Sequence, residues 1–381
     1  MLLAVISLAS VGKVVTFLVM LSILIVLHEG GHFVLARRNG VRVNEFAVGM
    51  GPLLYGWRSP RTGTLYSLRA LPIGGYCLME GEDNKTTEAE QQREFRQNES
   101  DWSQSQNFQA KSPWNRLAIV LAGPVTNFVL AYLILLVGAV AFGVPSDHLD
   151  RAVVTSVVAG SPADQHGLKP GDRIVSVSAN GKKVTDANAL VTTIHDSLGK
   201  TIDLTYERDG VAKMIEIAPA PCPPEVGTKL GCIGFSPEPA FERVPLVSAV
   251  RYSALEFAGV ADQTFMSLGL LVTHFTKYAG QISGPVGMGQ IAGIVQDFGW
   301  GPYFSFAATI SFALGLFNLL PIPALDGGRA AFIIAELLRG KPIDPDKEAV
   351  VHIAGFAALM ALMLLVAFHD IARIVSGQGV L

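Results

Sequence analysis

The residues with the clearest chemical potential are two histidines and a glutamate near the N-terminus, in the run His28-Glu29-Gly30-Gly31-His32. On a helix, residues four positions apart share a face, so the His28 and His32 imidazoles can bind one metal ion. Glu29 lies about 100° around the helix, where it can reach a metal-bound water without being a ligand. Zinc lowers the pKa of such a water, and a carboxylate can take its proton as the water attacks a carbonyl group. The motif therefore predicts metal-assisted hydrolysis with Glu29 as the general base.

A catalytic zinc site also needs a third protein ligand and one open position. Glu45 is the nearest downstream candidate, but it follows two arginines that mark the end of the apolar segment around the histidines. Asp326 is better placed, because it ends another apolar segment. Pro321 and Pro323 interrupt the helix just before Asp326 and free backbone that has to line a polar cavity. On its own, LDGG would indicate a helix C-terminal turn; in this setting we expect Asp326 to complete the metal site.

The apolar segments around these residues define the class of the chain. Of its 381 residues, 50% are hydrophobic and 16% are charged, against about a quarter charged in soluble proteins. The apolar residues are concentrated in segments long enough to cross a bilayer core of about 30 Å. Four transmembrane helices are predicted, at residues 14–36, 117–146, 300–326 and 349–370. Two histidines and a glutamate are costly inside a lipid-spanning helix, which favours a functional cluster over a packing contact.

The distribution of lysine and arginine predicts the orientation in the membrane. The segment 37–116 carries eleven of them, and the short loop between the third and fourth predicted spans carries four. We expect both loops to be cytoplasmic and residues from about 147 to 297 to lie outside, which in a Gram-negative bacterium is the periplasm. The expected location is the bacterial inner membrane, with the active site near its cytoplasmic side.

Residues 246–280 allow two interpretations. They are apolar enough for a fifth span, but they carry Arg251, Glu256, Asp262 and Lys277. Such charges are costly in lipid, and an amphipathic helix at the membrane surface accommodates them. A fifth crossing would also place the last basic loop outside. We therefore expect an interfacial helix here.

Two hydrophilic modules join the predicted spans. Residues 43–79 alternate apolar and polar side chains between turn signals, which predicts a membrane-associated β-hairpin or small sheet. Residues 151–235 combine short strands, helices and tight turns, as in a small α/β domain. Its segment GSPADQHGLKPGDRIVSVSANGKKV (160–184) resembles a circularly permuted bacterial PDZ domain. Such domains bind peptide C-termini or extended segments by strand addition.

The three cysteines fit no thiolate metal framework. Cys222 and Cys232 flank a Pro/Gly-rich loop on the predicted oxidising side, where a disulfide or two free thiols are both compatible with the sequence. The segment LGCIGF (230–235), which includes Cys232, is similar to the PDZ loop that binds a peptide carboxylate. The alternative interpretation of this segment is a strand with only a structural role.

Several of these motifs together resemble the site-2 protease family, peptidase family M50. They are HExxH in the first predicted span, NxxPxPxLDG (318–327) in the third, and a PDZ domain between the second and third. The likeness is greatest to the bacterial regulator-of-sigma-E proteases. Two further segments, GPVTN (123–127) and LPIGGY (71–76), also match the sequence pattern of these proteases. The best-known members have two PDZ domains, whereas we identify one, so this chain resembles a single-PDZ variant.

The resemblance implies a Zn2+ ion bound by His28, His32 and Asp326, with Glu29 as the catalytic residue. It implies that Asn318 holds substrate and that the hairpin presents an extended strand to the site. Within LPIGGY, Gly74 and Gly75 are the candidate positions for binding the unwound substrate.

The function implied is that of an intramembrane zinc metalloendopeptidase acting in regulated intramembrane proteolysis. Its substrates would be single-span membrane proteins, with anti-sigma factors, polarity factors and remnant signal peptides as the known classes. Two other classes fit parts of the sequence. A non-catalytic PDZ-bearing scaffold would not need Glu29, and a metal or ion transporter tends to show internal repeats, which do not occur here. No basic stripe suggests a nucleic-acid partner.

Overall fold

The computed structural model describes residues 8–81, 104–146, 152–179, 181–222, 230–238, 241–278 and 283–376. The chain forms two compact units, one made of residues 1–138 and 253–381 and the other of residues 139–252. Each unit is described by itself.

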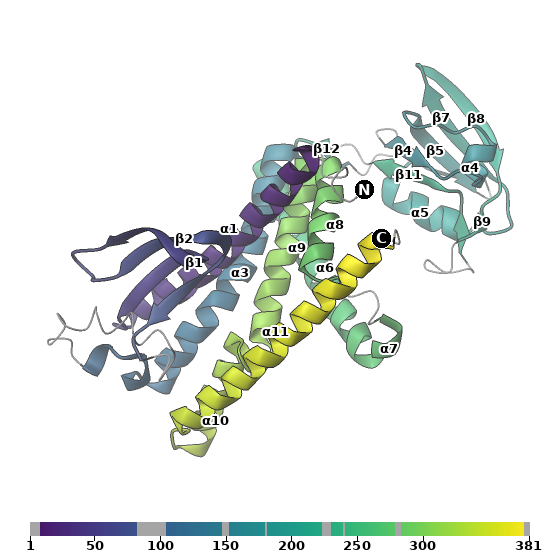
Figure 1. The fold of residues 1–381 in the computed structure, drawn as a ribbon. Helices are drawn as coiled ribbons and strands as arrows, with labels where there is room; N and C mark the ends of the chain where they lie inside the picture. The colour runs from purple at the N-terminus through teal and green to yellow at the C-terminus, as the bar shows by residue number, and fades with distance from the viewer. Residues whose placement is uncertain are drawn as a thin grey trace. The chain divides into compact units, whose positions relative to one another are not determined.

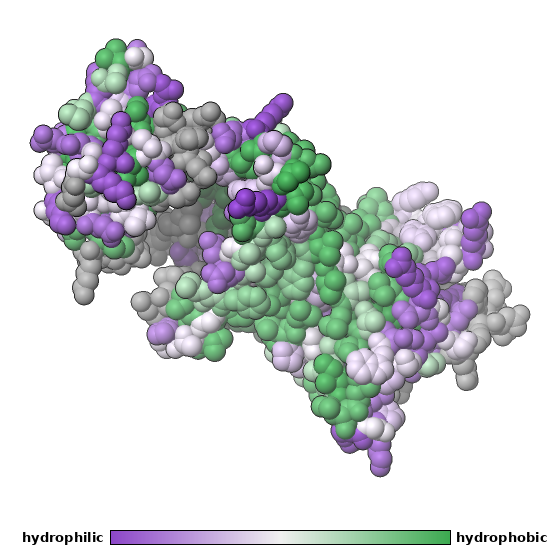
Figure 2. Space-filling view, turned by 180° about the vertical axis from the view of Figure 1, so that it is seen from behind, coloured by the Kyte–Doolittle hydropathy of each residue, from purple (hydrophilic) through white to green (hydrophobic). Residues whose placement is uncertain are grey.

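Long apolar helices dominate the chain (Figure 1). Five are long and apolar enough to cross a membrane: α1 (Leu8–Arg38), α3 (Pro113–Phe142), α6 (Leu246–Thr273), α9 (Trp300–Leu319) and α11 (Pro345–Val375). Figure 2 shows hydrophobic side chains covering the middle of these helices on the face in view. The chain is therefore a helical membrane protein with five candidate spans. Sequence analysis expects four, and the additional candidate is α6, which has the lowest mean hydropathy of the five, 1.2.

Small residues allow close helix packing around α3. A Cβ atom at Gly31 of α1 would lie 2.5 Å from the Ala122 carbonyl oxygen, and one at Gly315 of α9 would lie 2.9 Å from the Pro124 carbonyl oxygen. Only glycine permits such backbone approach, as is usual between helices in membranes. Helix α8 (Pro285–Asp297) packs with α1 and α9 through buried apolar side chains.

A two-stranded antiparallel sheet lies beside α1 (Figure 1). Its strands are β1 (Val43–Arg58) and β2 (Leu65–Met79), in the region where alternation predicts a hairpin. The Ser22 hydroxyl of α1 donates a hydrogen bond to the Pro72 carbonyl oxygen of β2. Farther along, a Cβ at Gly75 would meet Val26 of α1 at 3.3 Å and the Ala47 carbonyl oxygen of β1 at 2.6 Å. Strand β2 therefore runs close along the helix that carries the HExxH motif.

The segment that carries Asp326 differs from the expected continuous helix over residues 300–326. Helix α9 ends at Leu319, and Asp326 is the first residue of a separate helix, α10 (Asp326–Arg339). The prolines between them cannot donate backbone hydrogen bonds and break the helix. The loop folds back on α10, since a Cβ at Gly327 would lie 2.2 Å from the Leu320 carbonyl oxygen. This close approach requires glycine directly after Asp326.

The second unit contains a six-stranded antiparallel sheet in the order β11-β4-β5-β7-β8, with β6 paired to β5. Its elements are β4 (Val153–Val157), α4 (Pro162–Gln165), β5 (Arg173–Ala179), β6 (Lys182–Val184), α5 (Ala187–His195), β7 (Ile202–Arg208), β8 (Val211–Ile217) and β11 (Phe235–Glu238). The core is apolar and centres on Ile174, Leu190 and Leu204. Asn180, in one of the tight turns predicted for this domain (Asn180-Gly181), lies outside the described residues.

The remaining elements are short. They are η2 (Gln104–Gln106), η3 (Phe108–Ala110), β3 (Val144–Pro145) paired with β12 (Phe241–Glu242), β9 (Ala220–Pro221) paired with β10 (Gly231–Cys232), and α7 (Phe275–Tyr278). A disulfide joins Cys222 to Cys232, which settles the choice between disulfide and free thiols that the sequence leaves open.

Candidate active site

Two residues of α1 and the first residue of α10 meet in one cluster. The Nε2 atoms of His28 and His32 lie 3.1 and 3.3 Å from Asp326 Oδ2, and 3.3 Å from each other. Ligand atoms on a tetrahedral zinc ion are about 3.4 Å apart, given bonds near 2.1 Å. The three side chains predicted from sequence as ligands therefore lie together at metal-binding separation, although Asp326 lies 294 positions after His32 in the sequence.

The cluster also has the chemistry that a metal ion requires. Asp326 Oδ2 is buried and has no hydrogen-bond partner among the described residues. His32 Nδ1 lies 2.9 Å from the Ile119 carbonyl oxygen, which can only accept a hydrogen bond. The proton of the neutral ring is therefore on Nδ1, and the Nε2 lone pair points to the cluster. A backbone carbonyl of this kind commonly orients a metal-binding histidine.

Asn127 of α3 contacts the Nδ1 atom of His28, as the Ile119 carbonyl group contacts that of His32. Its side-chain amide lies against His28 Nδ1, with Nδ2 at 3.1 Å, and its Oδ1 is buried with no partner in the described part of the chain. Turning this amide by 180° exchanges the two atoms. Oδ1 then accepts the Nδ1 proton and gains a partner, and His28 Nε2 is left free for metal. A metal ion bound at His28 Nε2 would therefore select this orientation of the Asn127 side chain.

Gly123 leaves the space in which both rings sit. A Cβ at this position would lie 2.2 Å from His32 Nε2 and 2.7 Å from His28 Cε1. Sequence reasoning gave no role to Gly123, Asn127 or Ile119. The GPVTN pattern includes the first two and was the signal that could have drawn attention to them.

Glu29 lies beside the backbone of strand β2. The Cys77 backbone N–H, both histidines and Asp326 all lie close enough to the Glu29 carboxylate to interact with its charge. The Cys77 side chain is buried. Burial and, secondarily, the charge of Glu29 raise the pKa of this thiol, so it stays protonated and is not a thiolate ligand.

The other candidates from sequence lie around the cluster. Glu45, the alternative third ligand, lies on β1, where its Oε1 accepts hydrogen bonds from Arg69 Nη2 at 2.7 Å and Ser67 Oγ at 2.5 Å, apart from the histidines. Asn318 is in the last turn of α9, before the loop that leads to Asp326. Gly74 and Gly75 are buried in β2 beside α1.

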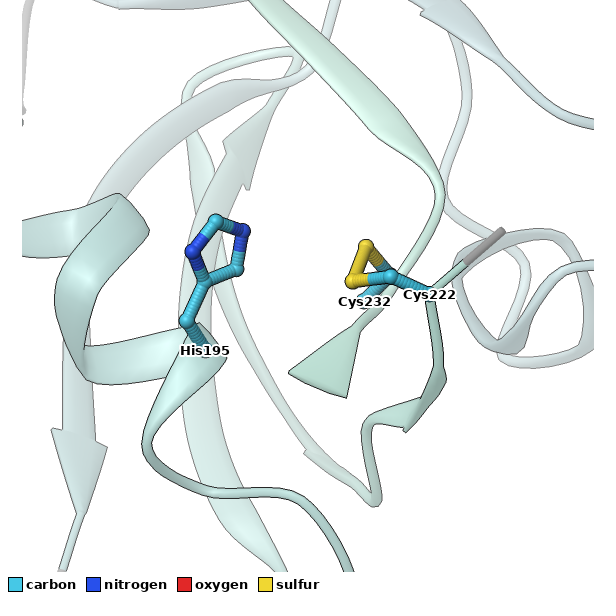
Figure 3. Close-up of side chains that lie close together, drawn as sticks. All are labelled: His195, Cys222 and Cys232. Carbon is cyan, nitrogen blue, oxygen red and sulfur yellow. A yellow bond between two sulfur atoms is a disulfide. The ribbon is translucent and has the colours of Figure 1, made fainter. Parts of the chain in front are cut away.

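A second group of metal-binding residue types occurs in the other unit. Figure 3 shows the His195 ring, at the end of α5, beside Cys222 and Cys232. Both sulfur atoms are consumed by the disulfide. A disulfide offers no thiolate, so this group is not a zinc site in the oxidised protein.

A buried histidine pair and aspartate on the helices of a membrane protein, with an adjacent glutamate, define a membrane-embedded metallohydrolase. A family model for peptidase family M50 matches residues 16–362, and the chain belongs to this family.

Individual relatives cover almost the whole chain. The regulator of sigma-W protease RasP of Bacillus subtilis is 32% identical over 429 aligned residues, covering 96% of this chain and 99% of RasP. The zinc metalloprotease RasP of Bacillus licheniformis is 31% identical, with 95% and 99% covered. A Clostridium acetobutylicum protein, whose name places it among the zinc metalloproteases, is 34% identical, with 94% and 97% covered. The chain is thus an intramembrane zinc metalloprotease of the site-2 type, and its cofactor is Zn2+.

Proposed function

We propose that His28, His32 and Asp326 bind the catalytic zinc ion and that Glu29 is the general base for peptide hydrolysis. The observation that carries this proposal is the separation of 3.1–3.3 Å among three buried ligand atoms. One of them is a carboxylate oxygen for which the described part of the chain offers no other partner. The zinc ion supplies Lewis acidity, which lowers the pKa of a bound water and polarises the scissile carbonyl group.

The protein residues orient the metal ligands and transfer the protons. Ile119 and Asn127 fix the histidine tautomers from α3, and the Cys77 N–H lies near the Glu29 carboxylate. Glu29 takes a proton from the attacking water and returns it to the leaving amine nitrogen. Non-catalytic scaffolding and transport remain the alternatives, and neither requires a glutamate held beside the metal ligands.

The proposed substrates are single-span membrane proteins, cleaved within or near the membrane-spanning segment. A helical substrate must unwind to expose its scissile amide. Strand β2 lies against α1 and contacts Glu29, so it is suited to hold the unwound segment by strand addition near Gly74 and Gly75. Asn318 is proposed to bind substrate from the end of α9.

The second unit is proposed to be a PDZ domain that binds peptide C-termini or extended segments. Its antiparallel sheet with an accompanying helix and an edge strand, β11, directly after the LGCIGF loop supports this assignment. We place the chain in the regulator-of-sigma-E protease subgroup as a single-PDZ variant. A relative named for the regulation of sigma-W favours anti-sigma factors over polarity factors and remnant signal peptides as substrates.

The proposed topology has four membrane spans, with α6 at the membrane surface. The four charges that α6 and α7 carry over residues 246–280 support a surface position. The second unit would then lie outside the cytoplasm, and its Cys222–Cys232 disulfide fits the oxidising side of a bacterial membrane.

The decisive experiment is Glu29→Gln in the full-length protein. The amide cannot take the proton of the attacking water, so we expect turnover of a single-span substrate to fall by several orders of magnitude while zinc content and substrate pull-down persist. Cleavage by the variant at near the wild-type rate would refute the general-base role. If neither form cleaves and both retain the substrate, the scaffold alternative is correct.

A further inference from the structure

The chain reaches Asp326 through an unfavourable backbone conformation. Ala324 has a φ of +78°. Among the described residues, Asp209 is the only other non-glycine residue with a positive φ, and it lies in the turn between β7 and β8. Residues with a Cβ atom avoid this left-handed region, so surrounding contacts must hold Ala324 in place.

The main contact comes from α11. The Ala324 backbone N–H donates a hydrogen bond to His352 Nδ1, at 2.9 Å. Three residues farther along the same helix, a Cβ at Gly355 would lie 2.4 Å from the Pro323 Cβ, so α11 approaches the loop as closely as it can. The His352 ring also packs against Phe332 of α10, with ring centroids 5.5 Å apart. One imidazole therefore contacts both the loop before Asp326 and the helix after it.

Apart from its contacts with His28 and His32, the Asp326 side chain has few local interactions that set its direction. Leu325, the N-cap residue of α10, makes no side-chain capping bond, and its backbone N–H donates to the Ile322 carbonyl oxygen at 3.1 Å. Asp326 Oδ2 has no hydrogen-bond partner among the described residues. The backbone two residues earlier, where His352 holds Ala324, is therefore one of the elements that position the carboxylate.

We propose that His352 is a positioning residue that fixes the metal-binding aspartate through the Ala324 N–H. This inference rests on the proposed assignment of Asp326 as a zinc ligand. Because Nδ1 accepts a hydrogen bond, the neutral ring carries its proton on Nε2, which points toward Glu348 Oε1 at 3.9 Å. His352 thereby acts on the metal without touching it, as outer partners of metal ligands do.

Two amide variants separate this role from simple packing. In His352→Asn, the side-chain Oδ1 stands where Nδ1 stood and can still accept from Ala324. In His352→Gln, the polar atoms lie one bond farther out, and His352→Leu has no acceptor at all. His369→Leu is the matched control, since His369 is an exposed histidine near the other end of the same helix.

The test is the rate at which zinc leaves the full-length, zinc-loaded protein in detergent when a chelator is added in excess. We expect His352→Gln and His352→Leu to release zinc about 10- to 100-fold faster than the wild type, the effect typical of lost outer-shell partners. His352→Asn and His369→Leu should stay within a few-fold of the wild-type rate. Should the leucine variant not fold, the asparagine and glutamine pair decides alone.

The positioning role is wrong if the glutamine variant retains zinc as well as the wild type, or if the asparagine and glutamine variants lose it equally fast. His28→Ala is measured in parallel. If His28→Ala keeps its zinc, the assigned zinc site is wrong; if it loses zinc while the His352 variants do not, only the role of His352 fails.

Discussion

Gly123 on α3 lies directly against His32 on α1, so close that a single methyl group at Gly123 would come within 2.2 Å of the Nε2 atom of His32. Adding that methyl group must displace the ring or separate the two helices, since real Cβ atoms do not approach so closely. We expect Gly123→Ala to lower the zinc content of the purified protein at least about tenfold, as measured by metal analysis.

Gly30→Ala is the control for that experiment. Gly30 lies inside the HExxH motif, but a Cβ there would meet no atom within 4 Å, and alanine is the better helix former. Its zinc content should equal that of the wild type. Equal zinc in both variants would show that the space at Gly123 is not needed by the metal site.

Asn127 provides a test of the histidine tautomer. Metal binding by His28 Nε2 requires a proton on Nδ1 and an acceptor facing it. Asn127→Asp keeps an acceptor oxygen, so we expect zinc affinity near that of the wild type, whereas Asn127→Leu should weaken zinc binding about 10- to 100-fold. If the aspartate variant loses zinc as badly as the leucine variant, Asn127 donates to His28 and the assigned tautomer is wrong.

The proposed orientation can be tested with single introduced cysteines. Lys213 on β8 and Arg61 in the β1–β2 turn are both exposed. We expect a membrane-impermeant maleimide to label Lys213→Cys in intact cells and Arg61→Cys only after the membrane is opened. The native cysteines should contribute little, as Cys77 is buried and the others are paired. Labelling of position 61 from outside would reverse the topology.

The second unit should lose stability in acid through one ion pair. Asp172 is 1% exposed, and Arg208 donates Nε to its Oδ1 and Nη2 to its Oδ2, both at 2.6 Å. Burial alone would raise the pKa of Asp172, but the hydrogen bonds and charge of Arg208 outweigh it, so the pKa lies below its usual value. The unfolded chain therefore binds this proton more readily, and the pair stabilises the fold above about pH 4. That contribution is lost as the pH falls through the lower folded pKa.

Hydrogen exchange of the β5 and β7 amides in the full-length protein measures this effect. Asp172→Asn should open these strands more readily than the wild type at pH 7, and the difference should shrink below about pH 4. Glu216→Gln, an exposed change on β8, should have little effect at either pH. A difference between Asp172→Asn and the wild type that does not depend on pH would mean that the charge of Asp172 contributes nothing.

The grouping of His28, His32 and Asp326 was predictable because their signals are local. The spacing of His28 and His32 is a property of one helical turn, and Asp326 stands out as the only acid between the third apolar block and the next basic residue. The residues that contact the two histidines were not predictable. Asn127, Gly123 and Ile119 lie on α3, and only the packing of α3 against α1 brings them to the histidines. The boundaries were also harder to place, because α9 ends seven residues earlier than expected, at Leu319. The mean hydropathy of α6 is the lowest of the five candidate spans. The sequence alone therefore hardly favours a membrane-spanning helix over a helix at the membrane surface.

The part of Cys77 that interacts with Glu29 is its backbone N–H. No exchange of one side chain for another at position 77, proline excepted, removes that donor. A scan of side-chain substitutions at position 77 would therefore leave the interaction between this N–H and Glu29 untested. An insertion or deletion of one residue in β2 would instead move a different amide to Glu29 and turn every side chain of the strand to the opposite face. The interaction with Glu29 thus constrains the length of the strand that bears Cys77, while the identity of its buried side chain is constrained by packing alone.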